Sequence, residues 1–338
     1  MMPQAQITLV VREPSQVAEA RRRAAELAGL LSFDETMTGK LAIAVTEAGT
    51  NLLKHGGGGS MLIRPLGSGS SGGIEVIAFD RGPGMANVTE SMRDGHSTAG
   101  SPGTGLGAMS RQTSRFDIYS REGGGAALRF EVWAHPPSAP APLEVGAVCV
   151  AMPGETVAGD AWTAIHTARR HVILVADGLG HGPDAAAASQ AAAKVLEDNW
   201  QQGAAEIMTA IHDALRVTRG AAGAIAVLQP GREIGTFCGI GNIAAMTSVN
   251  GKTRHLVSYN GILGHNMSKL REFDFPFPAQ ALLVLHSDGL APRWKLENYP
   301  GLEARHPSLI AAVLYRDQTL ERDDSTVVVV RNNAGPQP

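Results

Sequence analysis

The 338-residue chain lacks the features that mark several large protein classes. It has only two cysteines, Cys149 and Cys238, so we predict no disulfide framework and a cytoplasmic location. No apolar run reaches the roughly 18 residues of a membrane-spanning helix, and we expect no signal peptide, because the N-terminal sequence lacks its apolar stretch. Basic and acidic residues nearly balance, at 29 against 32, so we expect neither nucleic acid nor membrane as a partner.

Glycine is plentiful, at 40 residues, and it gathers in short clusters. The hydrophobic fraction of 43% is enough for a folded chain, whose length suggests about two domains. Residues 135–142 contain four prolines, a density that favours an extended connector over a helix or a central strand. We therefore predict a first domain over residues 1–134, a connector over 135–143 and a second domain over 144–338.

Two helices are predicted near the N-terminus, over residues 14–29 and 34–55. Three polar residues of the second helix lie four positions apart and therefore share one side of it: Glu47, Asn51 and His55. Such a stripe is ordinarily a solvated face. Here it runs into a tetraglycine at residues 56–59, which favours a functional role.

Two glycine motifs follow in the same half. A predicted strand over residues 74–79 ends at Asp80, which begins the pattern Asp-x-Gly-x-Gly with Gly82 and Gly84. About 20 residues later a glycine-rich turn, residues 103–107, precedes a helical stretch predicted over 108–114. A turn of this kind offers free N–H groups to phosphates. Each motif alone is weak, because Asp-x-Gly is ordinary turn chemistry.

Together and in this order, the three motifs resemble the Bergerat-type (GHKL) ATPase and kinase superfamily, and in particular its anti-sigma-factor serine kinases. The resemblance covers roughly residues 5–133 and implies an N-terminal α/β sandwich that binds ATP. It implies that Asn51 holds Mg²⁺ against the phosphates and that Glu47 is the general base for the substrate hydroxyl. Asp80 would accept a hydrogen bond from the adenine amino group. The remaining nucleotide contacts would come from Gly82, Gly84, Gly103, Thr104, Gly105, Leu106 and Gly107.

The second half places aspartates beside glycines at predicted strand ends. Asp177 ends a strand over residues 171–177, Asp288 ends one over 281–288, and Asp323 precedes one over 325–331. A fourth, Asp160, follows Gly159. One such aspartate is usually a turn former. Four of them favour an oxygen-rich pocket for Mg²⁺ or Mn²⁺, and no cysteine and histidine cluster has zinc spacing.

This pattern resembles the metal-dependent serine/threonine phosphatases of the type 2C (PPM) kind, in the branch of the sporulation stage II E and stress-response enzymes. The resemblance covers about residues 144–331 and implies an α-β-β-α sandwich. Asp177 would bridge two metal ions, which would activate water for attack on phosphorus. The other ligands implied are the Gly178 carbonyl, Asp160, Asp288 and Asp323. His181 stands two residues beyond the place of a proposed acid in larger relatives, and such a residue is ordinarily a loop histidine.

The expected chain is thus of the α/β (α+β) class and carries a kinase and a phosphatase for signal transduction in a stress response. Both resembled families act on small anti-sigma-factor antagonists of the STAS type, so we expect such a partner; a homodimer is compatible with the sequence. Two alternatives stay open. The first half could sequester a partner without phosphorylating it, or it could act as a nucleotide sensor that gates the phosphatase.

Overall fold

The computed structural model describes residues 6–67, 72–92, 105–137, 141–229, 231–267 and 269–333. The chain divides into two compact units. The first contains residues 1–139 and 304–316, and the second contains residues 140–303 and 317–338. Both units mix helices and antiparallel sheets, which confirms the predicted fold class. The sequence prediction of ranges 1–134, 135–143 and 144–338 did not anticipate that residues 304–316 group with the first unit.

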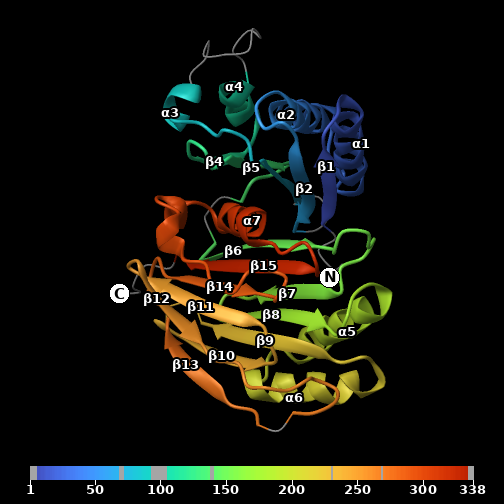
Figure 1. The fold of residues 1–338 in the computed structure, drawn as a ribbon, viewed down its shortest axis with the longest axis vertical. Helices are drawn as coiled ribbons and strands as arrows, with labels where there is room; N and C mark the ends of the chain where they lie inside the picture. The colour runs from blue at the N-terminus through green and yellow to red at the C-terminus, as the bar shows by residue number, and fades with distance from the viewer. Residues whose placement is uncertain are drawn as a thin grey trace. The chain divides into compact units, whose positions relative to one another are not determined.

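The first unit is built on one five-stranded antiparallel sheet of order β1-β2-β3-β5-β4. Its strands are β1 (Ile7–Val11), β2 (Gly59–Leu66), β3 (Gly73–Phe79), β4 (Arg115–Ser120) and β5 (Ala126–Trp133). Two helices, α1 (Pro14–Leu30) and α2 (Glu35–Lys54), pack on each other and on this sheet (Figure 1). The short α3 (Val88–Ser91) and α4 (Gly105–Gln112) follow, and α4 begins three residues before the predicted helical stretch.

Local chemistry explains why α1 and α2 form where they do. Asp34 caps α2, because its side chain accepts a hydrogen bond from the Met37 N–H at 2.7 Å. The apolar positions of α2 are buried at helical spacing, as the sequence predicts: Leu41, Ala44, Val45, Ala48 and Leu52. A Cβ on Gly49 would lie 2.9 Å from the methyl groups of Val17, so glycine allows α1 and α2 to approach closely.

The second unit has two five-stranded antiparallel sheets, of orders β13-β10-β9-β8-β7 and β12-β11-β14-β15-β6. Their inner faces share one hydrophobic core, to which Phe237 and Leu285 belong. The strands are β6 (Leu143–Val150), β7 (Asp160–His166), β8 (His171–Gly178), β9 (Ala221–Leu228), β10 (Ile234–Ile240), β11 (Ala244–Val249), β12 (Lys252–Leu256), β13 (Glu272–Pro276), β14 (Leu282–His286) and β15 (Ser325–Asn332).

Two helices, α5 (Pro183–Asn199) and α6 (Ala204–Ala214), cover the outer face of the sheet that contains β8 and β9 (Figure 1). Buried alanines on α5 keep it close to that sheet. Short 3-10 turns, η2 (Leu215–Val217), η3 (Leu296–Asn298) and η4 (Leu302–Ala304), precede the last helix, α7 (Pro307–Gln318). No helix in the described part of the chain is both long and apolar enough to cross a membrane.

Candidate nucleotide and metal sites

The candidate nucleotide residues of the first unit come from α2, from the end of β3 and from the start of α4. Glu47 and Asn51 lie one turn apart on α2, and both are half-buried. The end of α2 touches the turn after β3, because a Cβ on Gly82 would lie 2.8 Å from the His55 carbonyl oxygen and 2.8 Å from the Gly56 Cα. Two of the predicted motifs therefore meet in space.

Asp80 is held in one orientation at the end of β3. Its Oδ1 atom accepts hydrogen bonds from the backbone N–H of Gly82 at 2.8 Å and of Ala126 at 3.2 Å. The side chain is 9% exposed, and Oδ2 has no hydrogen bond within the described residues. Gly84 has a φ of +68°, and a Cβ there would lie 2.1 Å from the Arg121 carbonyl oxygen, so the turn requires glycine. A fixed carboxylate with one oxygen left over suits an amino-group donor.

Gly105, Leu106 and Gly107 form the first turn of α4, which packs against α2. The first N–H groups of a helix have no partner within it, so this end can bind an anion. No atom of the described residues lies within 4 Å of the position that a Cβ on Gly105 would take. The other two residues predicted for this turn, Gly103 and Thr104, lie outside the described residues.

Two of the predicted metal ligands face each other across a strand pair in the second unit. Asp160 opens β7, and its direct partner on β8 is Asp177. Like charges in this arrangement destabilise a sheet unless a proton or a cation neutralises them. Asp160 is 5% exposed, and its Oδ2 accepts a hydrogen bond from the Ser287 hydroxyl at 2.7 Å. Gly178 follows Asp177, and a Cβ there would lie 2.0 Å from the Ala185 carbonyl oxygen.

The other acidic residues lie on two loops that touch each other. Asp288 follows β14 and accepts a hydrogen bond from the Asn242 side chain at 2.7 Å. A Cβ on Gly289 would lie 2.0 Å from the carbonyl oxygen of Asp324, so the loop after β14 contacts the one before β15. Strands far apart in the sequence therefore bring their acidic ends together.

Asp323 and Asp324 have different environments. Both carboxylate oxygens of Asp324 accept backbone N–H groups, from Met152 at 2.8 Å and from Gly159 at 2.8 Å, which fixes the loop leading to Asp160. Asp323 accepts only the N–H of Asp324, at 2.9 Å, among the described residues. Asp323, which the resemblance implies as a metal ligand, therefore keeps more oxygen lone pairs for another ligand.

Four of these acidic side chains have raised pKa values, because burial and neighbouring negative charges favour the protonated form. Burial, followed by the charges of Asp160 and Asp288, raises the pKa of Asp177 to about 9. Burial raises the pKa of Asp160 to about 7, although the hydroxyl of Ser287 opposes this. The pKa of Asp288 and that of Asp324 are also raised, mainly by burial. A divalent cation would relieve this repulsion, and carboxylates are the ligands that Mg²⁺ and Mn²⁺ prefer.

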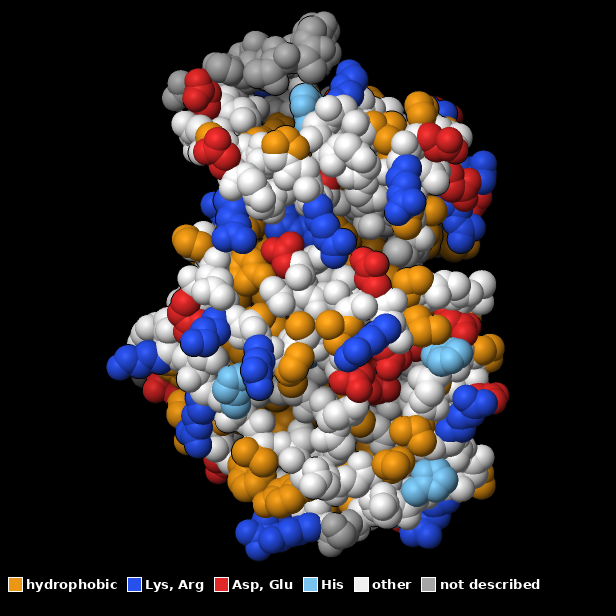
Figure 2. Space-filling model, viewed as in Figure 1, with side chains coloured by type: hydrophobic (Ala, Val, Ile, Leu, Met, Phe, Trp, Pro, Cys, Tyr) orange, Lys and Arg blue, Asp and Glu red, His pale blue; other side chains and the backbone are white. Residues whose placement is uncertain are grey.

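Within the described residues, however, no group of three or more His, Cys, Asp or Glu side chains is arranged to hold a metal ion as it stands. The oxygen ligands and the uncompensated negative charge of this group fit a divalent cation, which could bind at the cross-strand pair of Asp160 and Asp177. Figure 2 shows acidic side chains gathered in a close group on the displayed face of the second unit.

Sequence reasoning missed several residues that support these carboxylates. The Ser287 hydroxyl donates a hydrogen bond to Asp160, and the Asn242 side chain donates one to Asp288. The exposed His181 forms a 2.7 Å contact from Nδ1 to Oε1 of Glu155, a residue that no motif contained. The only available signal was that Ser287 directly precedes an aspartate already singled out.

Each half of the chain matches a protein-family model. Residues 10–132 match the family model described as histidine kinase-like ATPase domain. Residues 167–333 match the model described as stage II sporulation protein E (SpoIIE). The two ranges lie on either side of the proline-rich segment and confirm the two resemblances read from the motifs.

Two curated proteins of Bacillus subtilis (strain 168) resemble different parts of the chain. The serine/threonine-protein kinase RsbT is 28% identical over 117 residues, which are 35% of this chain and 88% of the relative. The phosphoserine phosphatase RsbX is 24% identical over 138 residues, 40% of this chain and 69% of the relative. A solved structure described as "The bacterial stressosome: a modular system that has been adapted to control secondary messenger signaling" is 28% identical. It covers 56% of this chain and 99% of its own, with a TM-score of 0.52.

Proposed function

Because the chain joins a histidine kinase-like ATPase domain to a domain of the stage II sporulation protein E family, we propose that it is a bifunctional regulator of protein phosphorylation. The first domain transfers phosphate from ATP to a serine or threonine of a partner protein, with Mg²⁺. The second removes that phosphate with Mn²⁺ or Mg²⁺. The similarity of the two halves to a serine/threonine-protein kinase and a phosphoserine phosphatase supports this pairing.

The observation that carries the phosphatase proposal is the cross-strand pair Asp160 and Asp177. The two loops that carry Asp288 and Asp323 contact each other, and Ser287, beside Asp288, hydrogen-bonds Asp160. The residues that would hold the cations are Asp160, Asp177, the Gly178 carbonyl, Asp288 and Asp323. When bound, two divalent cations neutralise the phosphoryl group and lower the pKa of water. The hydrogen bonds from Ser287 and Asn242 orient two of these carboxylates before substrate arrives.

In the kinase proposal, Glu47 accepts the proton of the substrate hydroxyl, and the oxygen of that hydroxyl forms a bond to the γ-phosphorus of ATP. The bond from that phosphorus to the bridging oxygen of ADP breaks in the same step. Asn51, one turn along α2, would hold Mg²⁺ against the phosphates, and the first turn of α4 would donate N–H groups to them. Asp80 would accept the adenine amino group, with Gly82 and Gly84 shaping the wall beside it.

The phosphatase is tested by hydrolysis of p-nitrophenyl phosphate by the full chain with Mn²⁺. Asp177→Asn keeps the size of the side chain but removes its charge, and we expect a loss of at least about 100-fold in kcat/KM, which corresponds to roughly 2.7 kcal/mol. Asp213→Asn on α6 is the matched control, because Asp213 is an exposed acid whose one ion pair among the described residues is the local pair with Arg216. Full activity in Asp177→Asn would end the metal-site proposal.

The kinase is tested by transfer of labelled γ-phosphate from ATP to a purified STAS-domain antagonist protein. We expect transfer by the wild type and its loss in Glu47→Gln, with nucleotide binding retained. If the partner binds but receives no label from the wild type, the first domain sequesters it instead. We further propose a cytoplasmic regulator whose substrate is this antagonist class and whose two activities set the antagonist's phosphorylation state.

A further inference from the structure

The helix α7 is attached to the candidate nucleotide turn by a reciprocal pair of arginines. Arg316, near the end of α7, is 2% exposed, and its Nη1 donates to the backbone carbonyl of Asp80 at 3.2 Å. Arg81 donates in return from Nε to the backbone carbonyl of Arg316 at 3.0 Å, and its Nη2 donates to the same oxygen. Residues 304–316 belong to the first unit, so these contacts lie within that unit. Asp80 is therefore bonded directly to the helix.

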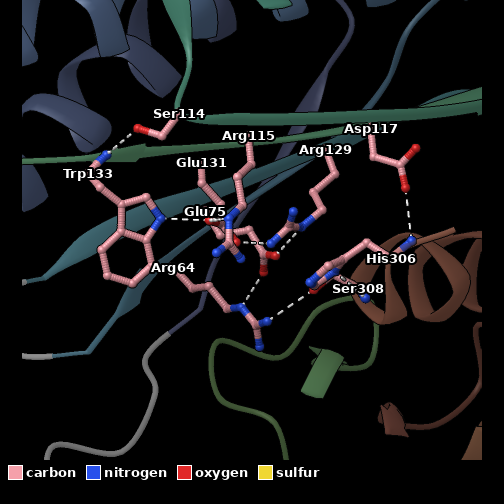
Figure 3. Close-up of polar contacts among 10 residues, drawn as sticks. All are labelled: Arg64, Glu75, Ser114, Arg115, Asp117, Arg129, Glu131, Trp133, His306 and Ser308. Atoms are coloured by element: carbon pink, nitrogen blue, oxygen red, sulfur yellow. Dashed lines mark hydrogen bonds and ion pairs between the residues drawn. The ribbon is translucent and has the colours of Figure 1, made fainter. Parts of the chain in front are cut away.

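The other end of α7 is anchored on the same sheet. The Ser308 hydroxyl accepts a hydrogen bond from Arg64 Nη2 at 3.3 Å, and the N–H of His306 donates to Asp117 at 2.8 Å. Figure 3 shows both contacts beside the buried side chains of Glu75 and its neighbours. Those side chains alternate along β2 and β3 with the residues of the α1–α2 core, so they lie on the opposite face. The helix is thus held at both ends.

Beyond Arg316 the chain enters the second unit and binds both acidic loops at once. The carbonyl of Gln318 accepts the N–H of Ala291 at 2.8 Å, and the N–H of Leu320 donates to the carbonyl of Gly289 at 2.8 Å. Gly289 directly follows Asp288. The hydroxyl of Thr319 contacts that of Ser325 at 3.1 Å, two residues after Asp323.

The covalent path between the two sets of contacts is very short. Arg316 and Gln318 are two positions apart, with only Asp317 between them, which is at most about 7 Å of extended chain. A movement of the Asp80 turn that shifts Arg316 is therefore passed to the backbone beside Asp288 and Asp323, unless the two intervening peptide units absorb it. Helices transmit such shifts because their internal hydrogen bonds keep them rigid.

We propose that α7 couples the two sites, so that nucleotide bound at Asp80 alters the loops that carry Asp288 and Asp323. The inference rests on the proposed nucleotide and phosphatase functions and adds a regulatory element to them. The energy comes from a difference in nucleotide affinity between two positions of α7, and the effect is reciprocal: metal at the acidic loops changes nucleotide affinity by the same factor. Coupling of this kind is typically fivefold or more.

Hydrogen–deuterium exchange of the full chain, with and without Mg-ADP, tests the coupling without relying on enzyme activity. A peptide over residues 77–82 reports nucleotide binding, and peptides over 288–292 and 318–322 report the acidic loops. In the wild type we expect ADP to change exchange in all three, by about fivefold in the two distant peptides. A response confined to residues 77–82 would overturn the coupling but leave the nucleotide site intact. No response in any of the three would remove the nucleotide proposal and the coupling with it.

Two variants test whether α7 transmits the effect of the nucleotide to the acidic loops. In Arg81→Gln, whose side chain lies at the surface, ADP should still change exchange over residues 77–82, while the response over 288–292 should fall to less than half. Arg316→Lys should do the same and keeps a buried cation near the Asp80 carbonyl. Arg21→Gln on the exposed side of α1 is the matched control and should behave as the wild type. An undiminished distant response in both Arg81→Gln and Arg316→Lys would overturn α7 as the coupling element.

Discussion

Glu75 lies at the centre of a buried ion network in the first unit, and its replacement gives a sharp test of the packing described above. Its carboxylate accepts hydrogen bonds from Arg64 Nε at 2.5 Å and from Arg129 Nε at 2.6 Å. Glu131 pairs with Arg129 and accepts the Trp133 indole N–H at 2.6 Å. Four of these side chains are nearly inaccessible: Glu75 at 1%, Arg129 at 2%, Glu131 at 3% and Arg64 at 4% exposure. Figure 3 shows how they converge.

Glu75→Gln removes one negative charge and leaves Arg64 and Arg129 with less compensation in a site that excludes water. Breaking a buried ion pair by removing one partner costs about 3–5 kcal/mol, a large share of a typical stability of roughly 5–15 kcal/mol.

Native-state hydrogen exchange of the β3 and β5 amides measures this loss, because it reports the opening of the first unit separately from the second. Glu122→Gln, an exposed acid between β4 and β5, is the matched control and should change the free energy of unfolding by less than about 0.5 kcal/mol. If Glu75→Gln were as mild as this control, the buried network would not contribute as argued.

The same network has a defined pH dependence. Burial alone would raise the pKa of Glu75, but the positive charges of Arg64 and Arg129 outweigh it and hold this pKa well below its usual range. The unfolded chain therefore binds a proton below about pH 4.5 that the folded chain does not, and the stability contributed by Glu75 is lost as the pH falls. The difference between wild type and Glu75→Gln should be full at pH 7 and shrink toward pH 3.

Two further predictions concern the turn after β3 and the acidic loops. Gly84→Ala should lower the free energy of unfolding of the first unit by about 1–3 kcal/mol, because alanine would be held at a positive φ and against the Arg121 carbonyl. Gly123→Ala, also at a positive φ but with no described atom within 4 Å of the new Cβ, should cost less. Urea unfolding compares the two variants. Because the pKa values of Asp160 and Asp177 are raised, the metal-free second unit should lose stability as the pH rises from 4 through about 9. Mn²⁺ should therefore raise the melting temperature more at pH 8 than at pH 6. An equal rise at both pH values would contradict this.

The elements with clear periodicity were predictable, and those without it were not. The apolar residues of α2 recur at helical spacing, and the long strands β8 and β15 are continuous apolar runs. In α7, by contrast, nine of the twelve residues are buried, so no polar face marks it as a helix. Its grouping with the first unit depends on contacts from Arg81 and Arg64, which no local pattern encodes.

The acidic residues of the candidate metal site were identified from their positions at strand ends. The sequence did not reveal which of them is held by backbone N–H groups and which is left to bind a cation. Whether Asp323 or Asp324 is left free depends on which one meets the N–H groups of Met152 and Gly159, more than 160 positions away in the sequence. Side chains that only support the site, such as Ser287, belong to no motif. Strand pairing between distant segments decides these contacts, and it becomes visible only in three dimensions.

An anomalous-scattering map from crystals of the full chain grown with Mn²⁺ shows directly whether the acidic side chains bind metal ions. We expect two manganese peaks within coordination distance of Asp177, with Asp160, Asp288 and Asp323 completing the ligands. Asp324 should still accept its backbone N–H groups. No peak among these carboxylates under saturating Mn²⁺ would contradict the metal site and the phosphatase built on it.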